Sequence, residues 1–210
     1  MALIHRAVLK PTKLELLATW LPGRSWFQGP TVGETVNMGA YRFDDPAGEV
    51  GIETLLVRIG DGPVHQVPLT YRDAPLDGND EWLVGTTEHS VLGPRWVYDG
   101  CGDPVYATAL ASVIFSADRQ AQEFFEVDGE LVPREPTMVV TGNPGAEVDV
   151  PLVAAIRDVV PGDPTLIVTD SVRLTVLHRL DRDTHLEGST LTGTWKDQPT
   201  PLPLAYATPR

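Results

Sequence analysis

Turn-forming residues recur along the whole chain, and their spacing limits every regular element to a short length. The 210 residues include 19 Gly and 19 Pro, which are spread out rather than gathered into one linker. Between them lie short β-rich segments such as 50–59 and 165–170. Because Gly and Pro interrupt helices and strands alike, this pattern predicts many short strands joined by turns. We therefore expect an α+β fold, mainly antiparallel sheet with two or three short helices.

Two segments carry helix signals. Thr12 and Glu15 match a capping box, and apolar residues follow at helical spacing, which predicts a helix over 13–21. Asp103 is a favourable N-cap and is followed by a proline at the first helical position, which predicts a helix over 104–116. The second segment is apolar almost all round, so we expect it to pack against a sheet.

The remaining periodic segments favour strands. We expect strands at 2–9, 38–43, 50–59 and 64–71, one or two more within 81–100, and further short strands after residue 118. In the fourth of these, alternation predicts one face made of Val64, Gln66 and Pro68 and the other of His65, Val67 and Leu69. The stretch 151–160 leaves helix and strand open. We interpret the acidic stretch 118–135 as the boundary between two subdomains.

Charge and cysteine content exclude several classes of protein. The net charge of −13 offers no basic face for nucleic acid or for an anionic membrane surface. With Cys101 as its single cysteine the chain forms no internal disulfide, which favours a reducing compartment. No apolar run approaches the roughly 20 residues of a membrane span, and the N-terminus lacks a signal-peptide pattern. We expect a soluble cytoplasmic protein.

No stretch of the sequence forms a self-evident catalytic site. Cys101 precedes a helix N-terminus, where its thiol could be activated with His89 as base; the alternative is a small residue in a tight turn. His178 and His185, with the nearby Asp181 and Asp183, could meet around a metal only on a bent loop. Because neither arrangement is compelling and no phosphate-binding loop is present, we expect no catalytic residue, no metal and no cofactor.

Three segments together resemble the N-terminal cap of actinobacterial maltokinases and the related caps fused to trehalose synthases. They are "LPGRSWFQGP" (21–30), "IETLLVRIGDGPVHQVPLTYRDAPL" (52–76) and "PRWVYDGCGDPVYATAL" (94–110). The resemblance covers roughly the first half of the chain and implies a cap-like domain over 1–117 with a small, cystatin-like sheet-and-helix shape.

The second half carries a fainter likeness. Residues 164–180 are similar to a strand pair of the kinase N-lobe, so the resemblance implies a degenerate, β-rich N-lobe over 118–210. Thr175 stands where that family carries a nucleotide-contacting lysine. Complete maltokinases continue into a longer kinase domain, so we expect the catalytic Asp and Asn to be missing here as well.

The resemblance favours a non-catalytic cap-like protein of α-glucan, maltose, trehalose or glycogen metabolism. Such a protein would bind an enzyme of that pathway or an α-glucan. The alternatives are a sugar phosphotransferase-related enzyme with an atypical site and a small-ligand-binding β protein. The candidate binding residues, expected to cluster where strand ends meet, are Trp26, Tyr71, Arg72, Tyr98 and Asp99. Arg72 and Asp99 could pair with each other, and we expect Arg72 to matter for binding rather than for folding.

Overall fold

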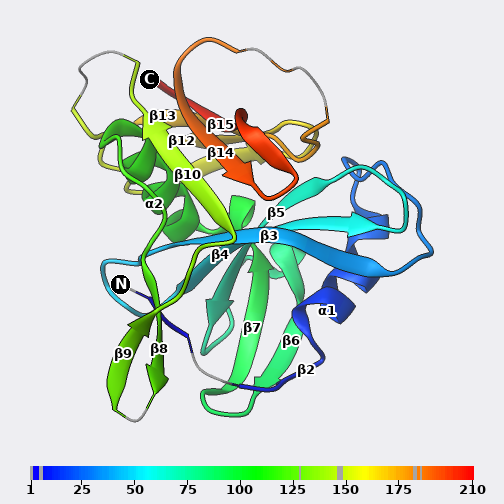
Figure 1. Cartoon of the computed structure of the whole chain (residues 1–210). Helices are drawn as coiled ribbons and strands as arrows, with labels where there is room; N and C mark the ends of the chain where they lie inside the picture. The colour runs from blue at the N-terminus through cyan, green and yellow to red at the C-terminus, as the bar shows by residue number, and fades with distance from the viewer. Residues whose placement is uncertain (1, 5–6, 128, 146–148, 182–183, 185) are drawn as a thin grey trace.

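The strands form three sheets accompanied by two α-helices (Figure 1). This computed structural model describes residues 2–4, 7–127, 129–145, 149–181, 184 and 186–210. Its helices are α1 (Lys13–Trp20), α2 (Pro104–Phe115) and three short 3-10 turns, η1 (Leu21–Gly23), η2 (Asp80–Trp82) and η3 (Gly100–Gly102). The predicted α+β class, with antiparallel sheet predominating, is confirmed. None of the helices in the described part is long and apolar enough to cross a bilayer.

Both predicted helix starts are confirmed in atomic detail. At α1 the Glu15 amide donates to the Thr12 hydroxyl (3.2 Å), and the Thr12 amide donates to the Glu15 carboxylate (2.7 Å). At α2 the Asp103 carboxylate accepts a hydrogen bond from the Val105 amide (2.9 Å). Each cap satisfies amide groups that have no partner inside the helix.

The first half of the chain forms a six-stranded antiparallel sheet, the N-terminal sheet, in the order β2-β6-β7-β5-β4-β3. Its strands are β2 (Leu9–Lys10), β3 (Thr35–Phe43), β4 (Gly51–Ile59), β5 (His65–Arg72), β6 (Leu83–His89) and β7 (Gly93–Asp99). Helix α1 covers one face, where Leu55 and Val67 pack with Leu17. The other face, represented by Ile52 and Leu56, packs toward α2. Because both faces are covered, β4 and β5 are buried along most of their length, and β4 is mainly apolar.

The second half forms another six-stranded antiparallel sheet, the C-terminal sheet, in the order β10-β14-β15-β13-β12-β11. Its strands are β10 (Met138–Asn143), β11 (Ile156–Val160), β12 (Thr165–Thr169), β13 (Val172–Val176), β14 (Ser189–Trp195) and β15 (Gln198–Pro209). Helix α2 packs against β10, β13 and β14, so it shares one hydrophobic core with both sheets. The stretch 151–160, which the sequence left open, becomes a strand only from Ile156 onward.

Gln66 ties the two sheets together at the start of β5. Its side-chain amide donates to the carbonyl oxygens of Leu177 (2.9 Å) and Leu204 (3.0 Å) and accepts from the Tyr41 hydroxyl (3.1 Å). Its backbone amide donates to the carbonyl of His178 at 2.7 Å. The predicted alternation of β5 is confirmed, because Gln66 reaches the C-terminal sheet while Val67 and Leu69 pack toward α1.

The N-terminal strand prediction is wrong in one respect. The segment 2–9 contributes to two sheets: β1 (Ala2–Ile4) pairs in parallel with β8 (Glu123–Val127), whereas β2 pairs with β6. A local pattern of apolar residues reports strand propensity but not the partner strand, so it could not reveal this change of sheet. The third sheet, in the order β1-β8-β9, is completed by β9 (Glu130–Pro133).

Candidate binding pocket beside Glu53

Three of the five candidate binding residues are interior side chains. Trp26, Tyr98 and Asp99 are each no more than 3% exposed. The Trp26 ring stacks on the buried His178 ring, with centroids 3.8 Å apart and planes 5° from parallel. The Tyr98 hydroxyl accepts a hydrogen bond from the backbone amide of Leu76 at 2.8 Å. The expectation that these residues form a surface cluster is therefore wrong.

Arg72 lies on the opposite face of the N-terminal sheet from Trp26. Its guanidinium makes two hydrogen bonds of 2.8 Å to the carboxylate of Asp103, which is fully buried and also accepts from the Thr70 hydroxyl (2.7 Å). Asp99 instead accepts from the Cys101 amide (3.0 Å), so the expected pairing of Arg72 with Asp99 is wrong. Arg72 holds the N-cap of α2 in place, which gives it a structural role that the sequence did not reveal.

Tyr71, the fifth candidate, is part of a charged cluster around Glu53. Glu53 lies on β4 with Arg42 as its direct partner on β3 and Tyr71 as a diagonal neighbour on β5. Its carboxylate accepts from Arg42 (2.9 Å), from the Tyr71 hydroxyl (2.8 Å) and from the Lys13 ammonium. Three donors thus converge on one carboxylate that is almost entirely buried.

The donors decide the protonation state of Glu53. Burial by itself raises the pKa of this carboxyl, but the charges of Arg42 and Lys13, together with hydrogen bonds from Lys13 and Tyr71, outweigh burial and lower the pKa to about 2. Burial and the adjacent Glu53 charge raise the pKa of Tyr71 well above its usual value, so its hydroxyl remains a donor. The cluster is therefore a fixed arrangement of charges at neutral pH.

A second carboxylate extends the cluster toward the surface. Glu123 on β8 contacts Arg42 (3.2 Å) and accepts from Arg134 (2.9 Å). Three cations therefore surround two carboxylates, which leaves this part of an otherwise acidic protein with one excess positive charge.

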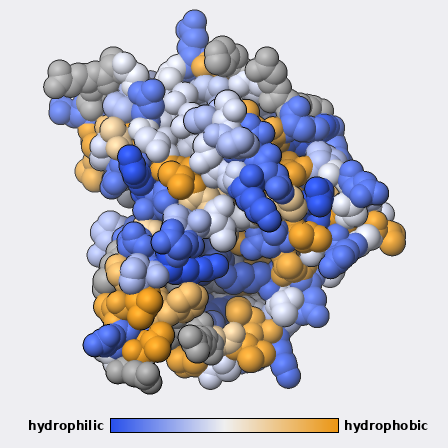
Figure 2. Space-filling model, viewed as in Figure 1, coloured by the Kyte–Doolittle hydropathy of each residue, from blue (hydrophilic) through white to orange (hydrophobic). Residues whose placement is uncertain are grey.

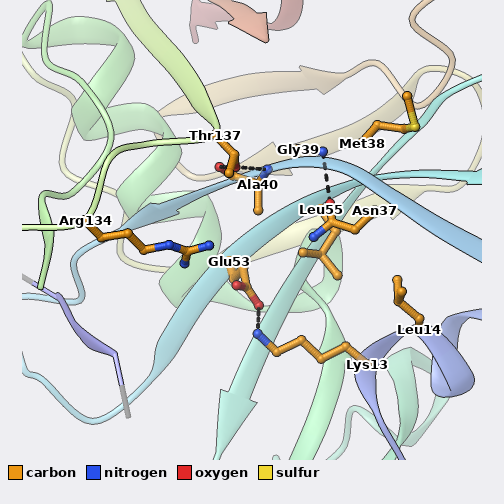
Figure 3. Close-up of a pocket in the computed structure, with 10 residues that line it drawn as sticks. All are labelled: Lys13, Leu14, Asn37, Met38, Gly39, Ala40, Glu53, Leu55, Arg134 and Thr137. Atoms are coloured by element: carbon orange, nitrogen blue, oxygen red, sulfur yellow. Dashed lines mark hydrogen bonds and ion pairs between the residues drawn. The ribbon is translucent and has the colours of Figure 1, made fainter. Parts of the chain in front are cut away.

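An open pocket of about 260 Å³ lies against this cluster (Figure 3). The polar ends of Lys13, Glu53, Arg134 and Asn37 point toward its interior from α1, β4, the segment after β9, and β3. The other lining residues are Leu14, Met38, Gly39, Ala40, Leu55 and Thr137. The pocket thus presents positive donors, one acceptor carboxylate and a short apolar wall to whatever enters it.

Local sequence features shape the walls of the pocket. The capping box of α1 places Lys13 in the first turn, from which its ammonium donates to Glu53. The register of β3 against β4 shifts between Asn37 and Gly39, and the Asn37 side chain accepts from the Gly39 amide (3.0 Å). A Cβ on Gly39 would lie 2.8 Å from the side chain of Met138, so glycine permits this close approach of the two halves.

Sequence reasoning missed Lys13, Glu53 and Arg134. One signal was present: Glu53 is the only acidic residue in the mainly apolar strand "GIETLLVRI". A charge in a strand that is buried on both faces requires a partner of opposite charge, so this position pointed to an ion pair. The identity of the partners depends on strand pairing and on α1, which the sequence pattern does not specify.

The alternative reading of Cys101 as a nucleophile meets a geometric obstacle. Cys101 is fully buried, and burial together with the neighbouring Asp99 raises its pKa well above the usual value. His89 pairs with Gly93 at the opposite end of β7 from Asp99, which corresponds to about 20 Å of strand. The pairing of Cys101 with His89 is therefore wrong.

Two of the four residues of the suggested metal cluster, His178 and Asp181, belong to the described part of the chain. Asp183 and His185 lie outside the described residues, while His178 is buried against Trp26 and Asp181 forms an ion pair with Arg179. Among the residues that the structure describes, no group of three His, Cys, Asp or Glu side chains is placed to hold a metal ion.

Comparison with known families supports the resemblance found in the sequence. Residues 20–103 match the family model of the maltokinase N-terminal cap domain. The match begins at the last residue of α1 and spans β3 to β7, which is less than half of the chain. It confirms the resemblance to the cap and links this segment to maltokinase-related α-glucan metabolism. No curated protein matches the chain significantly.

The matched segment contains only part of the pocket. Residues 37–40, Glu53 and Leu55 lie inside it, whereas Lys13, Arg134 and Thr137 lie outside. The pocket is therefore assembled where the cap-like sheet meets α1 and the segment that leads into the C-terminal sheet. Thr137 secures that contact, because its hydroxyl accepts from the Ala40 amide (3.0 Å) and donates to the Ala40 carbonyl (3.1 Å).

Proposed function

We propose that the chain is a non-catalytic, cap-like protein of α-glucan metabolism that acts in the cytoplasm and binds the end of a short α-glucan in the Glu53 pocket. The observation that carries this proposal is the convergence of Lys13, Asn37, Glu53 and Arg134 on one small cavity. The family match to the maltokinase cap supplies the metabolic context.

The chemistry of the pocket suits a sugar. A sugar hydroxyl donates one hydrogen bond and accepts others, so it is best held where donors and acceptors lie side by side. Lys13 and Arg134 supply charged donors, the Glu53 carboxylate supplies an acceptor, and Asn37 carries an amide that supplies both. The leucines at positions 14 and 55 offer apolar contact for the faces of a ring.

The size of the pocket favours a chain end over a long polymer. At about 260 Å³ it is slightly smaller than the roughly 300 Å³ at which small-molecule sites begin, and it is open to solvent. A terminal sugar unit would enter while the following units remain outside. Affinity should therefore depend little on the number of units beyond the first few.

Two features support a non-catalytic role. Thr175, at the position where the kinase family carries its lysine, lies on β13 between Leu166 and Tyr206 and brings no positive charge to a phosphate. Cys101 remains a buried thiol rather than a thiolate. We expect no sugar phosphate above a protein-free control when the protein is incubated with magnesium, ATP and maltose or trehalose; turnover that a point substitution abolishes would overturn this.

Calorimetric titration with maltose and maltotriose tests the binding proposal. We expect saturable binding, weakened by about tenfold or more in Arg134→Ala, because a lost hydrogen bond to a charged group costs about 1.5–3 kcal/mol. Arg95→Ala is the matched control, since Arg95 lies on β7 away from the pocket lining and its side chain donates to the neighbouring Pro94 carbonyl. Equal affinity of both variants, or no binding by the unsubstituted protein, would refute the proposal.

A second candidate function, capture of an enzyme of the maltose, trehalose or glycogen pathway, rests on a different part of the molecule. The hairpin formed by β8 and β9 projects from the body of the protein (Figure 1). The hairpin adjoins the Glu53 pocket through Arg134, which directly follows β9.

A further inference from the structure

The β8–β9 hairpin leaves one strand edge open. In the order β1-β8-β9, β8 is paired on both sides, whereas β9 has no second neighbour among the described residues. The hairpin extends away from the two large sheets at the lower left of Figure 1. It lies outside the segment that matches the cap family.

The hydrogen-bond pattern of the hairpin shows which backbone groups remain available. The Arg134 amide donates to the Glu123 carbonyl (2.9 Å), which fixes that pair as a hydrogen-bonded one. Antiparallel pairs alternate, so the pairs of Phe125 with Val132 and of Val127 with Glu130 also face inward. Leu131 therefore directs both its N–H and its C=O away from β8.

Pro133 limits how far a partner strand could extend along this edge. It is the next outward-facing residue after Leu131, and it has a carbonyl oxygen but no N–H. A strand added here would exchange two hydrogen bonds with Leu131 and at most one more with Pro133. The edge thus accepts a short segment in a defined register.

Apolar side chains are exposed around this edge on both faces of the hairpin. Leu131 is 49% exposed on one face, while Val132 and Val127 are 43% and 37% exposed on the other. Figure 2 shows hydrophobic side chains gathered over this hairpin at the lower left of the molecule. A hairpin exposed to water usually keeps one face polar, so apolar residues on both faces indicate a surface that another chain covers.

Acidic residues surround the apolar ones. Glu126, Glu130 and Glu135 are exposed, and none of them forms a salt bridge with a described residue. Two copies of this chain paired through β9 would bring these carboxylates together, in a protein that already carries a net charge of −13. A basic partner would be attracted by the same groups.

We propose that the β9 edge is a docking site for an extended segment of a partner protein in which apolar residues alternate with Lys or Arg. The segment adds a strand to the β1-β8-β9 sheet through Leu131, packs its apolar side chains on the face that carries Leu131, and places its cations on the opposite face, beside Glu130. This site uses none of the residues that line the sugar pocket, so the two proposals fail separately.

The test uses a synthetic peptide of alternating valine and lysine, about six residues long, which is a common strand length. Titration into isotopically labelled protein should shift the backbone amide signals of residues 129–133 and protect the Leu131 amide from hydrogen exchange. Binding should weaken as salt increases. A peptide of alternating valine and glutamate should not bind.

Two substitutions at one position separate the backbone from the side chain. Leu131→Ala removes apolar contact, whereas Leu131→Pro also removes the outward N–H without breaking a bond inside the hairpin. We expect Leu131→Pro to bind the lysine peptide about tenfold more weakly than Leu131→Ala, with the rest of the amide spectrum unchanged. Leu152→Ala, at an exposed leucine elsewhere, is the control and should bind normally.

Three outcomes would overturn the proposal. The first is equal binding of the acidic and basic peptides. The second is a set of shifts that excludes residues 129–133 or is insensitive to Leu131→Pro. The third is a concentration-dependent dimer, seen by sedimentation and lost in Leu131→Pro, which would identify the occupant as a second copy of this chain.

Discussion

Replacing Glu53 by Gln should reveal how strongly the charged cluster stabilises the fold. Gln keeps the size of the side chain but removes the charge that Arg42, Lys13 and Tyr71 surround. The pKa of about 2, against an ordinary value of 4.5, corresponds to roughly 3 kcal/mol of preference for the charged form in the folded protein. We therefore expect Glu53→Gln to lower the free energy of unfolding at pH 7 by about 2–3 kcal/mol, measured by urea denaturation.

The pH dependence of that loss provides an internal check. Because the pKa of Glu53 is lowered on folding, its contribution is complete above pH 4.5 and declines as the pH falls toward 2. By pH 3 the unsubstituted protein should have lost about 2 kcal/mol of this contribution, whereas Glu53→Gln has none to lose. The two unfolding free energies should therefore converge in acid.

The matched control is Glu88→Gln, which alters an exposed carboxylate on β6 and should change stability by less than about 0.5 kcal/mol. A loss below about 0.5 kcal/mol in Glu53→Gln would show that the cluster does not stabilise the fold. A difference between the unsubstituted protein and Glu53→Gln that stays constant from pH 7 to pH 3 would show that the pKa of Glu53 is not lowered.

Three further substitutions and titrations test other parts of the account. Arg72→Ala should lower the free energy of unfolding by about 2–3 kcal/mol, because it leaves the buried Asp103 without its cation, and thermal denaturation should show the loss. Burial raises the pKa of Asp99 to about 6, so its charged form is disfavoured in the folded protein. Asp99→Asn should therefore stabilise the protein above pH 6, and by progressively less as the pH falls toward 3.8. Melting curves of the variant and the unsubstituted protein at pH 7.5 and pH 5 measure this difference. His178 should stay neutral in an NMR titration down to about pH 5, because burial lowers its pKa to about 4; its contribution to stability is complete above pH 6.5 and is lost as the pH falls toward 4.

The local sequence was sufficient to predict where the two α-helices begin. The capping box at Thr12 and the Asp103 N-cap each depend on residues within three positions, so the sequence determined them directly. The alternation in β5 likewise predicted which side chains face each layer. These relations depend only on residues close in sequence, so they can be predicted without knowing the tertiary structure.

Long-range pairings could not be read from the same patterns. Trp26 and His178 stack although they lie in different halves of the chain, and Arg72 reaches Asp103 across 31 residues. Such contacts depend on the order of strands in the sheet and on the packing of the two halves. Trp26 consequently looked like a binding residue, since an aromatic side chain is equally suited to a core and to a surface.

The Glu53 pocket illustrates the same limit. Its charged residues come from α1, β4 and the segment after β9, and they meet only because the C-terminal sheet packs against the N-terminal one. The sequence offered one indication, the single carboxylate in a mainly apolar strand, but it did not identify the partners of that carboxylate. Family resemblance narrowed the metabolic context without locating the site, since the match ends before Arg134.

The central claim is that the Glu53 pocket holds a sugar, and an NMR titration of the isotopically labelled protein with maltotriose tests it most directly. The account predicts saturable shifts of the backbone amides of residues 37–40, of Glu53 and Leu55, and of Thr137, with the β8–β9 hairpin unaffected. No shifts at millimolar sugar, or shifts confined to residues outside this pocket, would contradict it.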